Sequence, residues 1–384
     1  MTTRSVHSSS SLPIVIVGGG IIGLSIGWLL ARRGAEVVIY DTAHTGSGAS
    51  HAAAGMLAAC TEVEPSEEWL LPLNRESQRL WPDFAAELEK ASGLSVDLRR
   101  EGTLHVALNA DEQARLRQHL ALQNKLGLPV EWLAAGKVRE REPYLAGSVT
   151  GAIWSPEDHQ VDNRKLAAAL RQVAITAGVV VHENTPVERI VIEHGRATGV
   201  AANGTVQPAA KVVLAAGAWS RTVGGLEGVN RPPVRPVKGQ MLALAMDAQQ
   251  PLLSHVVWAS GIYLVPRLDG RLIVGATAEE KGFDTRITAG GVLSLLQNAW
   301  RALPGIEELP LIETWTGFRP GSRDDAPILG AGPVEGLVYA TGHHRNGVLL
   351  TPVTAHIVSR FILDGELDPL AQDFSLARFL PAAE

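Results

Sequence analysis

Cysteine is almost absent from this chain, because its 384 residues include only Cys60. A single thiol excludes an internal disulfide, a cysteine-based zinc site and a Cys-x-x-Cys redox pair. Such sparse use of cysteine is typical of proteins that work in a reducing compartment. We therefore expect a cytoplasmic protein.

Excess positive charge is also missing. Lysine and arginine number 34 against 40 aspartates and glutamates, which gives a formal net charge of -6, and no run of five basic residues occurs. A polyanion would find no electrostatic attraction on such a chain. The composition therefore argues against a nucleic-acid partner.

Only one long apolar run is present, between residues 13 and 31. By hydropathy alone it could be a signal or transmembrane segment. Three glycines at its centre and the polar Arg32-Arg33-Gly34 after it instead favour a buried strand, a tight turn and a helix. We expect no membrane span, and we expect the serine-rich residues 1–11 to be a disordered leader.

The order of predicted elements indicates an α/β protein. Strand, helix and strand patterns at 14–17, 21–33 and 35–40 predict a βαβ unit. Similar segments return in the middle and at the end of the chain, whereas 229–317 reads as a mostly antiparallel sheet with one helix at 288–302. We expect a Rossmann-like domain from 12–90, 151–228 and 318–384, and a discontinuous substrate domain from 91–150 and 229–317.

A glycine motif of the form G-x-G-x-x-G follows the first strand and opens the first helix. Glycines at these positions permit a tight turn, close approach of a pyrophosphate and close packing of helix on sheet. The helix N-terminus favours phosphate, and an acid at the end of the second strand suits ribose hydroxyls. The predicted contacts are Gly18, Gly20, Ile21, Ile22, Gly23, Asp41 and Thr42. A turn that merely closes the strand–helix junction is the alternative.

Two further segments favour FAD over NAD. Small residues between 48 and 56 allow backbone to approach a flat, bulky ligand, and a Gly-bounded loop before the last helix resembles a second anion site. The predicted contacts are Ala49, Ser50, Ala54, Gly55, Met56, His343, His344, Arg345, Asn346, Gly347, Val348 and Leu349. Adjacent histidines cannot face the same way on regular structure, so we expect no metal site.

These segments together resemble the D-amino acid oxidase superfamily of flavoproteins, and within it the glycine oxidase branch linked to thiamine biosynthesis. Further matching stretches are E101-G-T-L, V161-D, A215-A-G-A-W-S, R235-P-V-K-G-Q, Y263-L-V-P-R, G275-A-T, G317-F-R-P and G342-H-H-R-N-G. The resemblance covers almost the whole chain. It implies a glutathione reductase-like FAD fold and adds Val187 and Gly217 to the expected cofactor contacts.

The resemblance also implies the chemistry. Arg319 and Tyr263 would hold the substrate carboxylate, with Arg345 as a second-choice ligand near the entrance. A small amino acid such as glycine would lose hydride from Cα to flavin N5, giving imino acid or glyoxylate, ammonia and, with oxygen, hydrogen peroxide. The family further implies a homotetramer and an imine handed to thiazole synthase. Since Cys60 lies outside the C-terminal half, where related enzymes link the flavin, FAD should be non-covalent.

Two departures from the family pattern and several alternatives stay open. Asp41 replaces a common glutamate, and His344 stands where an aromatic residue is expected. The substrate could instead be a D-amino acid or sarcosine, for an oxidase or a dehydrogenase, with Ala278 as a plausible pocket wall. The chain could also be a flavin-binding subunit without turnover, or an NAD-dependent dehydrogenase.

Overall fold

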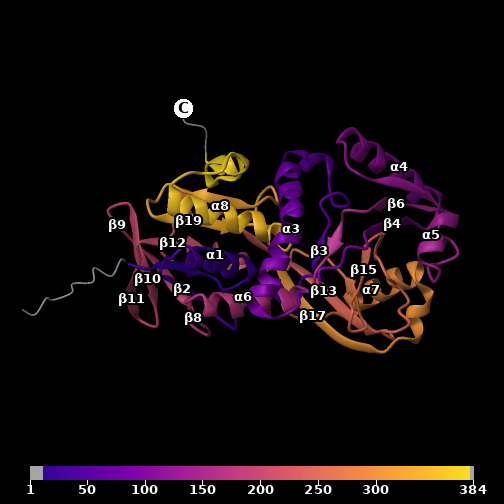
Figure 1. Ribbon diagram of the computed structural model, residues 1–384, viewed down its shortest axis with the longest axis horizontal. Coiled ribbons are helices and arrows are strands. Elements are labelled where there is room, and N and C mark those ends of the chain that lie inside the picture. The colour runs from indigo at the N-terminus through magenta and orange to yellow at the C-terminus, as the bar shows by residue number, and fades with distance from the viewer. Residues whose placement is uncertain (1–11, 381–384) are drawn as a thin grey trace, which may run out of the picture.

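The computed structural model describes residues 12–380. Figure 1 shows an elongated molecule with one sheet and its helices at each end, and with α3 (Leu71–Ser92) between them. The expected leader at 1–11 lies outside the described residues. Across residues 12–380 no helix combines the length and the apolar character needed to cross a membrane. The apolar run at 13–31 is instead a strand, a turn and a helix of 12 residues.

The first sheet has six strands in the order β18-β19-β12-β1-β2-β8, all parallel except for the edge strand β18. The central strand reads Ile-Val-Ile-Val and is buried along its length, as expected for a parallel strand covered on both faces. The strands are β1 (Ile14–Val17), β2 (Val37–Tyr40), β8 (Val180–His182), β12 (Lys211–Leu214), β18 (Ile328–Ala331) and β19 (Leu337–Thr341).

Helices cover one face of this sheet and a small antiparallel sheet covers the other. The side chains of α1, α3, α6 and α8 form one apolar core with the first face. The second core joins the sheet to three strands in the order β11-β10-β9. The elements are α1 (Ile21–Arg32), α6 (Asn163–Thr176), α8 (Thr351–Asp364), β9 (Val187–Glu193), β10 (Arg196–Ala202) and β11 (Thr205–Pro208).

The second large sheet has eight strands in the order β17-β13-β16-β15-β14-β4-β6-β5. Every pair is antiparallel except β14 with β4. Its strands are β4 (Thr103–Ala107), β5 (Glu131–Ala134), β6 (Gly151–Ser155), β13 (Arg235–Ala245), β14 (Val256–Ala259), β15 (Ile262–Pro266), β16 (Arg271–Gly275) and β17 (Leu311–Gly321).

Helix α7 (Ala289–Ala302) packs into the apolar core on one face of this sheet. Helix α4 (Ala110–Lys125) contributes to a smaller cluster with β4 and β6. The remaining elements are α2 (Ala49–Ala52), α5 (Ala135–Arg141) and the two-stranded pair of β3 (Met56–Leu57) with β7 (His159–Gln160).

The α/β class and the mostly antiparallel second sheet are confirmed, but two predicted segment boundaries are wrong. Strand β6 pairs with β4 and β5, so residues 151–155 belong to the eight-stranded sheet and not to the Rossmann-like part. The division at 317/318 cuts through β17. The apolar pattern identifies a buried strand, whereas sheet membership depends on pairing with strands distant in sequence.

A buried arginine joins the two large sheets. Arg267 follows β15 and is 6% exposed. Its guanidinium donates to Val161 O at 2.7 Å, Ala54 O at 2.8 Å, Asn163 Oδ1 at 3.0 Å and Gln160 Oε1 at 3.1 Å. These acceptors belong to the segments around β3, β7 and the start of α6. One side chain therefore fixes how the eight-stranded sheet sits against the six-stranded part of the molecule.

Replacing Arg267 by methionine should lower the free energy of unfolding by about 3 kcal/mol, because four buried acceptors lose their donor. Urea unfolding followed by tryptophan fluorescence measures the change. Arg33→Met is the matched control, since Arg33 pairs with Asp364 in solvent and its loss should leave the midpoint unchanged. An equal shift of the unfolding midpoint in the two variants would contradict the proposed role of Arg267 in joining the two sheets.

Candidate functional site

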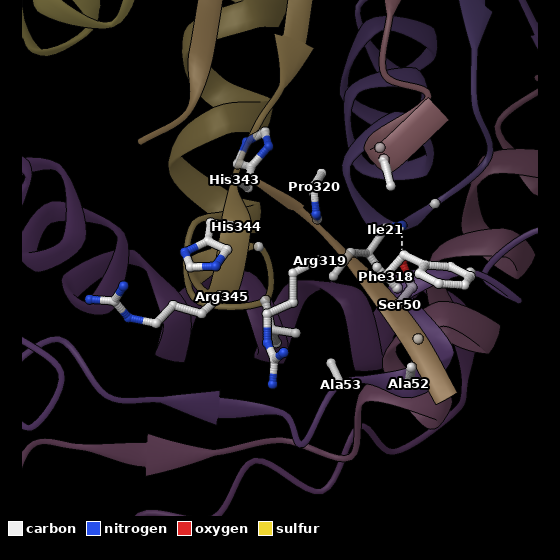
Figure 2. Close-up of a pocket in the computed structure, with 18 of the residues that line it drawn as sticks. Ile21, Ser50, Ala52, Ala53, Phe318, Arg319, Pro320, His343, His344 and Arg345 are labelled. Atoms are coloured by element: carbon white, nitrogen blue, oxygen red, sulfur yellow. Dashed lines mark hydrogen bonds between the residues drawn. The ribbon is translucent and has the colours of Figure 1, made fainter. Parts of the chain in front are cut away.

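A cavity of about 730 Å³ lies between the two large sheets. Its wall comes from the β1–α1 turn, the segment around α2, the strands β13, β15 and β17, and the loop before α8. Residues from the beginning, middle and end of the chain therefore meet here. Figure 2 shows part of this wall, with Arg319 and Phe318 from β17, and His344 and Arg345 from the loop before α8.

The glycine motif forms the turn that it predicts. Gly18 has φ +110°, and a Cβ there would lie 2.4 Å from Ala215 O. A Cβ on Gly23 would lie 2.0 Å from Gly18 O, so this glycine allows the helix to pack on the turn. Gly20 has an ordinary φ of -71°, and the nearest atom to its Cβ position is Ser50 Oγ at 3.2 Å. Gly18 and Gly23 thus serve folding, while Gly20 keeps the cavity wall open.

Ser50 and Asp41 organise the start of α1. Ser50 Oγ accepts a hydrogen bond from Ile21 N at 3.0 Å, which Figure 2 shows as a dashed line, and its own hydrogen stays available for a ligand. Asp41 accepts from Gly19 N at 2.7 Å and from Ala43 N at 2.9 Å. Burial raises the pKa of Asp41, although these two hydrogen bonds act to lower it. Asp41 therefore fixes the turn as well as lining the cavity.

The small residues of the segment 48–56 let backbone form the cavity wall. Asn163 Nδ2 donates to Ser50 O at 2.8 Å and to His51 O at 3.0 Å. Gly55 has φ +70°, and a Cβ there would lie 2.0 Å from Val161 O. The segment is thus held from the α6 side with its alanines facing the cavity.

Arg319 and Tyr263 lie in the part of the cavity wall that the eight-stranded sheet forms, each beside a glycine. A Cβ on Gly239 of β13 would lie 2.9 Å from Arg319 Nη1, and a Cβ on Gly275 of β16 would lie 2.3 Å from the Tyr263 ring. Arg319 Nη1 donates to Thr277 O at 3.1 Å, and Arg319 forms no ion pair with an acidic side chain in residues 12–380. Burial raises the pKa of Tyr263, so the phenol stays protonated as a donor.

Arg345 also lines the cavity, but its guanidinium is already engaged. Its Nη1 donates to Glu67 Oε1 at 3.0 Å, its Nη2 also contacts Glu67, and its Nε lies 2.9 Å from Glu62 Oε2. These carboxylates and burial hold Arg345 in place, and its pKa is raised above the ordinary value. The expectation of Arg345 as a direct substrate ligand is therefore not supported by its contacts. Sequence reasoning missed Glu62 altogether.

The two adjacent histidines lie in different surroundings. His343 Nε2 lies 3.0 Å from Thr354 Oγ1, and burial lowers the pKa of His343 to about 3. His344 has φ +46°, and burial lowers its pKa to about 4 even though Asp325 Oδ2 lies 3.9 Å from its Nδ1. Both imidazoles are therefore neutral near pH 7. His344 faces the cavity where an aromatic residue was expected.

Most of the predicted site residues line this one cavity. Three do not, because Gly23 packs against Gly18, Asn346 is buried, and the Leu349 carbonyl accepts from Trp81 and Ser77. Those that line it are Gly18, Gly20, Ile21, Ile22, Asp41, Thr42, Ala49, Ser50, Ala54, Gly55, Met56, Val187, Gly217, Tyr263, Arg319, His343, His344, Arg345, Gly347 and Val348. Residues that the sequence did not indicate include Glu62, Met241 and Trp258.

Residues 13–361 match the family model of FAD dependent oxidoreductases, named DAO. The chain belongs to this family. It is 39% identical over 370 residues to the glycine oxidase of Geobacillus kaustophilus, with coverage of 96% of this chain and 97% of the relative. A crystal structure of glycine oxidase from that organism superposes with a TM-score of 0.88 at 38% identity, covering 97% of this chain and 100% of that one.

A second kind of relative is longer. The bifunctional protein ThiO/ThiG of Trichormus variabilis is 38% identical over 368 residues, which cover 95% of this chain but 55% of that protein. The chain thus spans about half the length of this relative. A crystal structure of iminodiacetate oxidase from Chelativorans sp. BNC1 matches at 30% identity with a TM-score of 0.84, covering 94% of this chain and 98% of that one.

The protein is FAD-dependent, as its family is, and the cavity fits the cofactor. One end carries the α1 N-terminus and Asp41, suited to pyrophosphate and ribose, and at Gly20 only Ser50 Oγ comes within 4 Å of the Cβ position. The other end is broad and apolar, with Met241, Trp258 and Ala276 in one cluster beside Tyr263. Cys60 is fully buried outside the cavity, and burial raises the pKa of its thiol.

Gly20→Ala should weaken FAD binding by about tenfold or more while the apoprotein loses little stability, because the added methyl enters the cavity and meets only Ser50 Oγ, at 3.2 Å. Flavin absorbance per protein and the thermal midpoint of the apoprotein measure the two effects.

The comparison variant is Gly18→Ala, whose Cβ would meet the Ala215 carbonyl. It should lower the midpoint as well as the flavin content. If Gly20→Ala unfolded the apoprotein as much as Gly18→Ala, the division between folding and binding glycines would be wrong.

Proposed function

We propose that this protein oxidises glycine to the imino acid, which water converts to glyoxylate and ammonia, with oxygen reduced to hydrogen peroxide. The observation that carries the proposal is Arg319, whose guanidinium lies in the wall of the FAD-sized cavity beside Tyr263 without an acidic partner in residues 12–380. A small substrate carboxylate supplies that partner. The identity to a glycine oxidase along nearly its whole length supports the same substrate.

Arg319 would hold the carboxylate through two parallel hydrogen bonds, with Tyr263 as a further donor. Each charge-assisted bond contributes about 2 kcal/mol. The planar guanidinium fixes orientation as well as position, which a lysine would not. With the carboxylate fixed at one end, Cα of a small amino acid has few positions left to occupy.

FAD, when bound, would supply the redox chemistry as the acceptor of a hydride from the substrate Cα. The protein contributes binding and orientation. Gly18, Gly20, Ser50 and Asp41 would hold the dinucleotide, and the apolar cluster around Met241 and Trp258 would exclude water from the reacting end. Because Cys60 is buried away from the cavity, attachment through its thiol is not available, which supports non-covalent FAD.

The wider setting rests on the relatives. A protein that joins a ThiO to a ThiG portion supports an imine product passed on within thiamine biosynthesis, to a thiazole synthase as partner. A homotetramer has exposed apolar side chains available on α7 and β17, among them Leu293, Trp300 and Leu311. The single, buried cysteine suits the cytoplasm.

Arg319→Lys should lower kcat/KM for glycine by about 100-fold, because one point charge replaces two directed hydrogen bonds. Peroxide release at varied glycine concentration measures this, and retained flavin absorbance shows that the cofactor is still bound. Arg164→Lys is the matched control, since Arg164 pairs with Glu313 outside the cavity. Wild-type protein with bound FAD that is not bleached by anaerobic glycine would contradict the proposed function.

The substrate alternatives differ in the space that they need. Ala278 lines the cavity, and its small side chain would set the room beyond the substrate Cα. Ala278→Met should lower kcat/KM for D-alanine and D-proline relative to glycine by about tenfold, since filling one apolar position discriminates by about 1–3 kcal/mol. Ala331→Met on the exposed end of β18 is the control. An unchanged ratio would show that Ala278 does not bound the substrate.

A further inference from the structure

Glu62 is a cavity residue whose position is fixed from behind. The buried Asp158 accepts from Cys60 N at 3.0 Å, from Thr61 N at 2.7 Å and from Thr61 Oγ1 at 2.6 Å. These bonds hold the two residues that precede Glu62, so its backbone cannot move freely. The Glu62 side chain is 11% exposed and lines the cavity.

Arg345 holds the carboxylate of Glu62 from one side only. Arg345 Nε lies 2.9 Å from Glu62 Oε2, and its Nη2 donates to Glu62 O at 3.1 Å. This contact is an ion pair, and the buried Oε2 has no further partner among the described residues. No hydrogen bond to Oε1 from residues 12–380 occurs either. Both oxygens therefore keep acceptor capacity.

The groups that face Glu62 come from several elements. Arg345 from the loop before α8 and Arg319 from β17 favour its charged form, whereas Asp158 disfavours it. Burial raises the pKa of Tyr263 on β15, while the charge of Arg319 lowers this pKa and that of Glu62 raises it. Glu67 neutralises Arg345 from its other side. Burial outweighs the arginines and raises the pKa of Glu62 to about 7.

The cavity thus presents opposite charges to opposite ends of an amino acid. Arg319 is a cation without an acidic partner, and Glu62 is an anion with unused acceptor positions. A zwitterion bound with its carboxylate on Arg319 can direct its ammonium to Glu62. Amines must lose this proton before Cα–H is broken, since the nitrogen lone pair stabilises the positive charge that develops as hydride leaves.

We propose that Glu62 binds the substrate ammonium and accepts its proton, which makes it a catalytic residue of the proposed amine oxidation. The N–H bond breaks, the electron pair stays on nitrogen, and an O–H bond forms on the Glu62 carboxylate. No oxidant or further reactant is needed. The step rests on the proposed function, because it requires an amino-acid substrate.

The other titratable groups of the wall suit this task less well. Tyr263 has a raised pKa and is protonated at neutral pH. His343 lies against Thr354, and His344 has a pKa of about 4, so each imidazole is a weak base. Glu62, with a pKa of about 7, accepts a proton near the working pH and can return it afterwards.

The pH profile of kcat/KM for glycine tests the step in the FAD-loaded enzyme. A general base must be deprotonated, so wild-type kcat/KM should fall as pH drops below about 7 and level off above it. In Glu62→Gln, only glycine that has already lost its ammonium proton can react. Its profile should keep rising toward the amine pKa, which for lysine-type amines is about 10.4.

At pH 7, Glu62→Gln should lower kcat/KM for glycine by about 100-fold, and this difference from wild type should shrink as the pH rises. Glu67→Gln is the matched control, because it removes one carboxylate from the same arginine without lining the cavity. The Glu67→Gln variant should keep the wild-type fall of kcat/KM below about pH 7. Glu62→Asp should restore this pH dependence in part. A wild-type profile that climbs to the amine pKa, or equal profiles for the two glutamine variants, would overturn the proposal.

Binding gives a second readout that does not depend on turnover. The ligands 2-aminoisobutyrate and isobutyrate differ only in the ammonium group, and 2-aminoisobutyrate has no α-hydrogen to lose. Glu62→Gln should weaken binding of the first by about tenfold relative to the second, whereas Glu67→Gln should leave their ratio unchanged. Tryptophan fluorescence titration measures both constants.

If Glu62→Gln left the ratio of the two dissociation constants unchanged, the proposed contact between Glu62 and the ammonium group would be overturned. Failure of the proposed function looks different, because wild-type protein would then show no glycine-dependent bleaching of its flavin at any pH. Wild-type bleaching together with an unaltered Glu62→Gln variant would leave glycine oxidation standing and remove Glu62 from it.

Discussion

The cavity depends on one buried guanidinium. Arg267 lies between the two large sheets and donates to backbone and side-chain oxygens from three separate segments. Burial lowers the pKa of Arg267 to about 10, which still leaves it charged at neutral pH. Because its donors have fixed directions, they set the distance between the dinucleotide turn on one side and the strands that carry Arg319 and Tyr263 on the other.

Local chemistry made the turn after β1 predictable from the sequence. Gly18, Gly20 and Asp41 lie within one βαβ unit, where short-range turn geometry and strand order decide their positions. Arg319 and Tyr263 were identified through the family resemblance, and the structure adds the reason that they fit, since Gly239 and Gly275 leave space for them. No periodicity in the sequence carries that information.

The remainder depends on contacts between distant parts of the chain. Glu62 and Glu67 lie 283 and 278 residues before Arg345, with which they form one ion-pair cluster, so no spacing rule could join them. The same holds for β6, whose pattern predicts burial but not the sheet that it enters. Arg345 is an example, because the sequence does not distinguish an arginine that is free to bind a ligand from one that is paired with carboxylates.

The parallel sheet also constrains the synthesis of the protein. Its adjacent strands β1, β12 and β19 come from the first, the middle and the last parts of the chain. While the ribosome is still translating, β1 and β2 can pair, but β12 has no neighbour on its outer side until Leu337–Thr341 has emerged. An apolar strand edge of the nascent polypeptide therefore stays without its native partner until late in elongation, and unpaired edges of this kind promote association between chains.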